Sequence, residues 1–153
     1  MELKSTLKVF NAADVKDEPG IVEGQTIKRL VGNDERPSER IHAIRASFIP
    51  GIHEPLHWHF VEAFYYVISG RAVMTDIEGK RYDLGPGSFV YAPAGIAGTH
   101  DWDIKEPLQL IGVRGTTHRE KMIQFTVDEA TKESSITFEH LMRAGGDRFK
   151  SFY

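Results

Sequence analysis

Turn-forming residues divide the middle of this chain into segments of strand length. Proline and glycine stand together at 50–51, 85–87 and 93–95, and glycines also follow Ser69 and Glu78. Such residues favour tight turns, because proline fixes φ and glycine tolerates a positive φ. The segments between them are too short for long helices. The spacing therefore predicts an all-β fold, either an antiparallel barrel or a sandwich.

The segments between these turns have the composition of strands. They are rich in β-branched and aromatic residues, which fit the pleated surface of a sheet. We expect strands at 41–49, 63–68, 71–75, 88–91, 108–113 and 122–125. Two more are expected near 7–10 and 21–30, where they would cover a sheet edge or build a dimer contact. One short helix is expected over 138–144, between Thr137 as N-cap and the glycines at 145–146.

The length of 153 residues suits a single domain with its own core. We divide it into N-terminal strands with an edge or dimer extension (1–40), a barrel core (41–126) and a C-terminal helical tail (127–153). With 41% hydrophobic and 27% charged residues, the chain has the balance of a globular protein. We expect one folded unit.

Charge and hydropathy exclude several kinds of partner. The 22 acidic and 19 basic residues are spread along the chain, and no basic block would neutralise a run of phosphates. Nucleic acid is therefore not an expected partner. No stretch approaches the ~20 apolar residues of a membrane span, and the first ten residues lack the apolar core of a signal peptide. We expect no membrane partner and a cytoplasmic location.

The clearest chemical signal is the pair His57 and His59. On a strand, residues two apart point to the same face, so both imidazoles would face the inside of a barrel while Trp58 points away. The chain has no cysteine, so any metal must be held by His, Asp or Glu. Two neutral imidazoles at this spacing begin a metal site, although His-x-His by itself is also found without a metal.

The residues around this pair resemble the two sequence motifs of the cupin superfamily. The first motif, G-x5-H-x-H-x3,4-E-x6-G, is matched here by Gly51, His57, His59 and Gly70. The second, G-x5-P-x-G-x2-H-x3-N, is matched here by Gly87, Pro93 and Gly95. The resemblance implies a jelly-roll barrel, that is, an antiparallel double-stranded β-helix, of the small metal-binding kind. Because cupins commonly form dimers, it also implies a homodimer.

The first motif departs from the family pattern at its glutamate. Counting back from Gly70 places Ala63 where the metal-binding glutamate would stand, and the nearest carboxylate, Glu62, is one residue out of phase. A shift of one residue turns a strand side chain to the opposite face. Glu62 would therefore bind the metal only if the backbone bulged between His59 and Ala63. Otherwise it is a solvated glutamate at the start of a strand.

The second motif departs from the pattern at its histidine. Gly98 occupies that position, and His100 follows two residues later. A shift of two preserves the facing, so a slightly longer loop would bring His100 to His57 and His59 as a third ligand. The alternative is a flexible loop at 96–98 and a surface histidine beside Asp101, which would leave two ligands and an empty barrel.

Three neutral ligands would leave the full +2 charge on a metal ion. We therefore expect one divalent transition metal and a small anionic substrate. Imidazole suits Fe(II), the ion expected first, and also Mn, Ni, Co and Zn. The resemblance implies a metal-dependent enzyme for a small carboxylate or enolisable substrate, first of all a dioxygenase. A non-redox lyase, isomerase or decarboxylase with the metal as Lewis acid is one alternative, and a non-catalytic small-molecule-binding cupin is another.

Four residues are candidates for contacting a substrate. If Ala63 faces inward, Tyr65 shares its face and could donate a hydrogen bond or act as an acid, or simply pack in the core. Tyr91, Arg45 and Arg114 could orient a carboxylate. Arginine on a strand more often lies on a solvated face, which is the alternative for both arginines.

Overall fold

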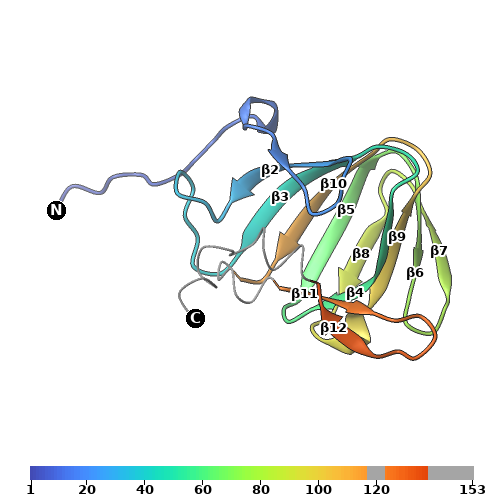
Figure 1. The fold of residues 1–153 in the computed structure, drawn as a ribbon. Coiled ribbons are helices and arrows are strands. Elements are labelled where there is room, and N and C mark those ends of the chain that lie inside the picture. Colours follow the sequence, from blue (N-terminus) through green and yellow to red (C-terminus); the bar gives the residue numbers. More distant parts are fainter. Residues whose placement is uncertain (117–122, 138–153) are drawn as a thin grey trace.

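The computed structural model describes residues 1–116 and 123–137, which form two antiparallel sheets (Figure 1). The first sheet has the order β1-β2-β3-β10-β5-β8: Glu18–Pro19, Gln25–Val31, His42–Phe48, Leu108–Arg114, Ala63–Ser69 and Phe89–Ala92. The second has the order β12-β11-β4-β9-β6-β7: Ser134–Ile136, Gln124–Val127, His53–His59, His100–Ile104, Ala72–Thr75 and Arg81–Leu84. Two short 3-10 turns, η1 (Ala12–Asp14) and η2 (Ile96–Gly98), complete the described elements. The expected all-β jelly-roll architecture is confirmed.

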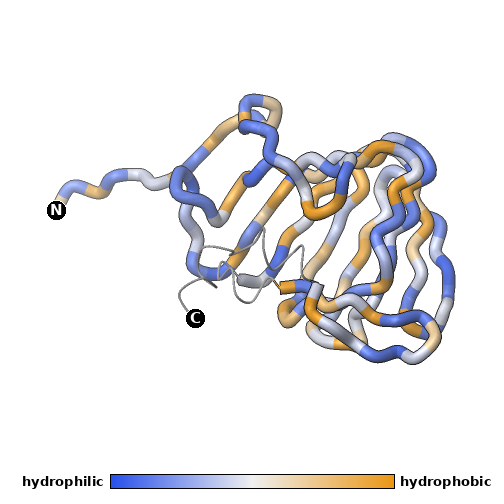
Figure 2. Tube along the Cα trace, in the orientation of Figure 1, coloured by the Kyte–Doolittle hydropathy of each residue, from blue (hydrophilic) through white to orange (hydrophobic). Residues whose placement is uncertain are grey.

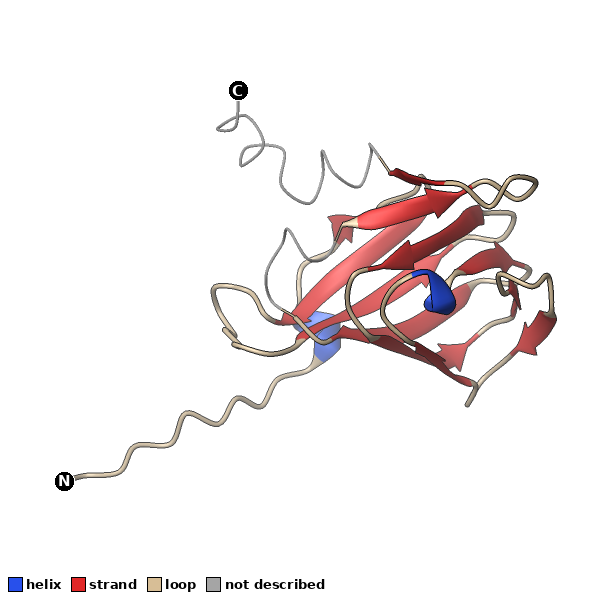
Figure 3. Ribbon diagram, turned by 90° about the horizontal axis from the view of Figure 1, so that it is seen from below, coloured by secondary structure: helices blue, strands red, loops and turns tan. Residues whose placement is uncertain are grey.

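The core lies between the two sheets, which face each other as layers in Figure 3. Hydrophobic and hydrophilic residues alternate along many strands (Figure 2), because successive side chains point to opposite faces of a sheet. In β5, for example, Val67 is fully buried, whereas its neighbours Tyr66 and Ile68 are exposed. From the second sheet, Ile104 and Trp102 of β9 complete this core.

Six of the expected strands correspond to β3, β5, β6, β8, β10 and β11, and the expectation near 21–30 corresponds to β2. The strand expected at 7–10 is wrong, because these residues pair with no other strand in the described structure. The helix expected over 138–144 lies outside the described residues. In the part of the chain that is described, no helix is long and apolar enough to cross a membrane.

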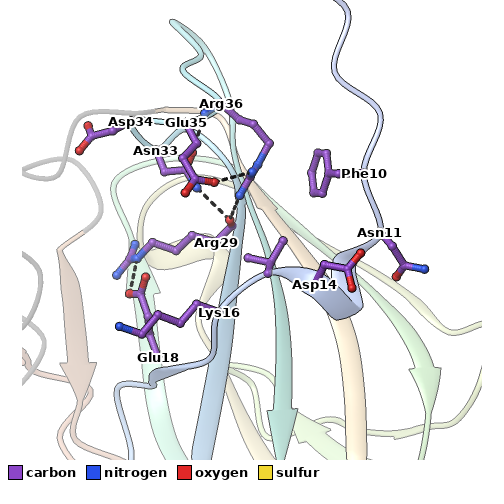
Figure 4. A pocket seen from close by; sticks show the side chains of 11 residues that line it. Phe10, Asn11, Asp14, Lys16, Glu18, Arg29, Asn33, Asp34, Glu35 and Arg36 are labelled. Carbon is purple, nitrogen blue, oxygen red and sulfur yellow. Dashed lines mark hydrogen bonds and ion pairs between the residues drawn. The ribbon is translucent and has the colours of Figure 1, made fainter.

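The N-terminal segment leads away from the barrel (Figure 1). The guanidinium of Arg36 lies over the Phe10 ring, 4.3 Å from its centroid. Beside it is a surface hollow between the N-terminal segment and β2 (Figure 4). Both arginines of the hollow form ion pairs, Arg29 with Glu18 and Arg36 with Glu35, each at 2.8 Å. The contact between Arg36 and Phe10 holds the N-terminal segment at this side of the barrel.

Candidate functional site

Three histidines meet on the inner face of the second sheet. His57 and His59 lie on β4, and His57 is directly paired with His100 of the neighbouring strand β9. The ring centroid of His57 lies 5.1 Å from that of His59 and 4.5 Å from that of His100. The ring centroids of His59 and His100 are 5.8 Å apart. All three side chains are buried. The structure thus brings together the three side chains that the sequence predicts as ligands.

A close backbone contact explains why this chain has Gly98 at the histidine position of the second motif and its histidine two residues further on, at His100. Gly98 ends the 3-10 turn η2, and a Cβ atom at this position would lie 2.0 Å from the carbonyl oxygen of Pro93. Only glycine fits there. His100 follows at the start of β9, with its side chain on the inner face.

Backbone hydrogen bonds fix how two of the imidazoles present their nitrogens. Nδ1 of His57 lies 2.7 Å from the carbonyl oxygen of Pro55, and Nδ1 of His100 lies 2.7 Å from that of Gly98. A carbonyl only accepts, so each Nδ1 carries the proton and each Nε2 keeps a lone pair. Nε2 of His100 is buried and has no hydrogen-bond partner among the residues that the structure describes. This is the arrangement in which protein imidazoles usually bind metal ions.

A β-bulge adds a carboxylate that the sequence pattern did not predict. Glu54 pairs with Trp102, whereas His57 pairs with His100, so β4 has one more residue than β9 across this interval. In a regular strand, residues three apart point to opposite faces. The extra residue shifts this alternation by one, so Glu54 points inward like His57. Its Oε1 lies 3.8 Å from Nε2 of His57 and accepts a hydrogen bond from Nε2 of Gln124 at 3.3 Å. Burial raises the pKa of Glu54.

The opposite sheet contributes a guanidinium and a phenol. Arg114, at the end of β10, places its Nη2 3.1 Å from Nε2 of His59. It also forms a side-chain hydrogen bond with Tyr65, whose ring centroid is 5.7 Å from that of His100. Burial raises the pKa of Tyr65, while the charge of Arg114 opposes this shift. Gly112, opposite Tyr65 on β10, makes room for the ring, because a Cβ there would lie 3.2 Å from it.

Burial keeps two of the histidines neutral down to low pH. It lowers the pKa of His57 from 6.5 to about 4. It lowers the pKa of His100 from 6.5 to about 3, and the charge of His57 adds to this shift. Near pH 7 both rings are therefore uncharged, which is the form that binds metals.

The lowered pKa values predict a loss of stability in acid. Below about pH 6.5 the unfolded chain binds protons at His57 and His100, whereas the folded chain does not. Each residue then lowers the free energy of unfolding by about 1.4 kcal/mol per pH unit as the pH falls toward its folded value. The raised pKa of Glu54 acts in the opposite direction, because it favours the folded state in acid.

To isolate one histidine, the metal-free protein and its His100→Gln variant are unfolded in denaturant between pH 7 and pH 4.5. We expect the variant to lose about 1.4 kcal/mol per pH unit less than the parent. The exposed His53 gives the matched control, and His53→Gln should keep the parent slope. Equal slopes for the parent and His100→Gln would contradict the burial of a neutral imidazole.

Comparison with known proteins identifies the family. Residues 44–114 match the family model of the cupin domain. They form a cupin domain. No curated protein matches the chain in sequence.

Solved structures share the fold of this cupin domain. The polyketide cyclase RemF from Streptomyces resistomycificus is 23% identical, with a TM-score of 0.61 over 72% of this chain and 80% of that one. KdgF from Halomonas sp. is 20% identical, with a TM-score of 0.62 over 74% and 98%. Oxalate decarboxylase from Bacillus subtilis is 22% identical, with a TM-score of 0.59 over 80% of this chain but only 33% of its own. A further structure of that decarboxylase, 22% identical with a TM-score of 0.56, concerns its Mn(II) centers.

The donors of the cupin domain fit a divalent ion at two of the three histidines. Nε2 of His100 has no hydrogen-bond partner among the described residues, and a buried acceptor left so costs about 1–3 kcal/mol unless something binds it. Nε2 of His57 also keeps its lone pair, because Nδ1 of that ring faces the carbonyl oxygen of Pro55 and carries the proton. At His59, however, Arg114 occupies Nε2. Consistent with this, no group of three or more His, Asp or Glu side chains among residues 1–116 and 123–137 could hold a metal ion as they lie. In this conformation the nitrogen that His59 would offer to a metal accepts a hydrogen bond from Arg114 instead.

The other candidates lie in different places in the cupin domain. Arg45, predicted to orient a substrate carboxylate, does not reach the cluster. Its side chain lies on the outer face of β3, opposite to that of the buried Ala46, and donates to Oε1 of Gln109. Tyr91, the other residue predicted to orient a carboxylate, also lies outside the cluster. It is exposed on the outer face of β8 and donates to Oε1 of Glu62 at 3.0 Å. Glu62 is also exposed and lies outside the cluster. Tyr65 lies inside it.

Proposed function

We propose that this cupin is a metal-dependent enzyme that acts on a small carboxylate or enolisable substrate by non-redox chemistry. The observation that carries this proposal is Glu54, a buried carboxylate 3.8 Å from His57 and on the same face as the three histidines. Enolate chemistry needs a group that accepts and returns a proton, whereas reaction with O2 can proceed without one. The similarity in fold to a cyclase and a decarboxylase supports the same class.

The residues of the cluster have distinct roles in this proposal. A divalent ion bound by His57, His59 and His100 would act as a Lewis acid toward an enolate oxygen. Arg114 binds and orients the carboxylate of the substrate, since a guanidinium matches a carboxylate in shape and charge. Glu54 accepts the proton from the carbon next to the carbonyl group, and its raised pKa brings it nearer to neutral pH.

The test measures proton exchange at carbon. Pyruvate and acetylacetone are incubated in D2O, without oxygen, with the protein and Mn(II), and loss of the C–H signal is followed by NMR. We expect the protein to accelerate exchange, because Glu54 removes the proton and solvent returns a deuteron. Glu54→Gln should slow exchange by about 100-fold, the size of a general-base contribution. Glu62→Gln, at an exposed position, is the control.

A dioxygenase remains the second candidate function, since three imidazoles also suit Fe(II). It would appear as O2 uptake by the Fe(II)-loaded protein with the same two compounds. Uptake of O2 together with no proton exchange would overturn the non-redox proposal.

A further inference from the structure

Arg114 occupies the side of the site from which the family glutamate is missing. The first cupin motif would place that glutamate at residue 63, where this chain has a buried alanine. Arg114 is the direct cross-strand partner of Ala63, between β10 and β5. A positively charged guanidinium thus stands beside the position where a negative carboxylate would be expected. The absence of a side chain beyond Cβ at Ala63 leaves space for it.

The guanidinium competes with a metal ion for one nitrogen. Nη2 of Arg114 lies 3.1 Å from Nε2 of His59, and an arginine nitrogen only donates, so this Nε2 is the acceptor. The same lone pair is the one that His59 would give to a metal. One imidazole nitrogen cannot serve both, and the positive charge of Arg114 also repels a cation. Metal binding at all three histidines therefore requires Arg114 to leave His59.

A bound carboxylate would compete with His59 for the guanidinium of Arg114. Hydrogen bonds from a guanidinium to a carboxylate are charge-assisted and often bidentate, and they are stronger than a bond to a neutral ring nitrogen. Arg114 is half-buried at the end of β10, so it keeps some access to solvent. An anion that binds it would also add negative charge close to the metal position.

We propose that Arg114 couples the two ligands of this site: a carboxylate draws Arg114 away from His59 and so completes the set of metal-binding histidines. Metal binding and anion binding then strengthen each other by the same factor, as linkage requires. This inference rests on the proposed function in one respect, namely that His57, His59 and His100 hold the metal. Without a bound carboxylate, the chain holds its metal weakly.

The test is a titration of metal-free protein with Mn(II), followed by the EPR signal of the free ion, with and without saturating propionate. Propionate has one carboxylate and binds Mn(II) weakly by itself. We expect it to raise the affinity for Mn(II) by about 10-fold, within the usual range of coupling between two sites. Propionamide, which is neutral and of the same shape, should have no effect. This comparison needs no variant.

Two variants separate the role of Arg114 from a general effect of charge. Arg114→Met should bind Mn(II) about 10-fold more tightly than the parent without propionate, and propionate should no longer matter. Arg45→Met removes the same charge from the outer face of β3 and should behave like the parent. If the parent binds Mn(II) but propionate has no effect on it, the coupling is wrong and the metal site stands. If Mn(II) binds to none of the proteins, with or without propionate, both proposals are overturned.

Discussion

Replacing His100 with alanine is expected to abolish retention of the metal and to weaken Mn(II) binding by at least about 100-fold, since loss of an outer-shell partner alone costs about 10–100-fold. The reason is the position of its Nε2, which is buried and has no hydrogen-bond partner within residues 1–116 and 123–137. The bond from Nδ1 to the carbonyl oxygen of Gly98 fixes the orientation of the ring. The measurement is metal content per chain by elemental analysis, together with Mn(II) titration, both in the presence of propionate. Far-UV circular dichroism should show that the β fold is kept.

His53 provides the matched control for this substitution. It lies on the same strand as His57 but is exposed, so His53→Ala should retain the metal. A His100→Ala protein that still holds one metal per chain would show that His100 is not a ligand.

Restoring the missing carboxylate by Ala63→Glu should change both affinities, in opposite directions. The new side chain would stand opposite Arg114 and form an ion pair with it, because the two positions are direct cross-strand partners. Arg114 would then release His59, and the glutamate would add negative charge to the site. We expect Mn(II) to bind about 10-fold more tightly and propionate about 10-fold more weakly, with the coupling between them lost.

Ala63→Gln tests whether charge or bulk causes these changes. Glutamine has the shape of glutamate without its charge, and it would fill the same space beside Ala92. It should weaken propionate binding only modestly and should leave Mn(II) binding close to that of the parent. If Ala63→Glu binds propionate as tightly as the parent does, Arg114 is not where the carboxylate binds.

The fold was predictable from turn residues and strand composition, except where strands are polar. The predicted strands did not include 81–84 and 100–104, although both segments lie in the second sheet. The first reads RYDL and the second HDWDI, so charged side chains conceal their strand character. At 7–10 the opposite error was made, since a strand was predicted where the structure has none. The segment has the composition of a strand, but no strand in the described part of the chain supplies its backbone with hydrogen bonds.

The site was predictable wherever strand alternation holds. His57 and His59 share a face because they are two residues apart, and His100 joins them because its two-residue displacement keeps the facing. Alternation fails at Glu54, since the bulge in β4 turns inward a residue that the pattern places outside. Arg45 was misplaced for a different reason: it lies between Ile44 and Ala46 on β3, and strand alternation already placed it on the opposite face from these apolar neighbours.

We propose above all that His57, His59 and His100 hold a divalent metal in this cupin. The most direct test is diffraction from crystals grown with Mn(II) and propionate, with anomalous data collected on both sides of the manganese absorption edge. We expect one anomalous peak per chain at bonding distance, about 2.1 Å, from the Nε2 atoms of all three histidines, with Arg114 turned away from His59. No peak at this cluster, with Arg114 still bonded to His59, would contradict it.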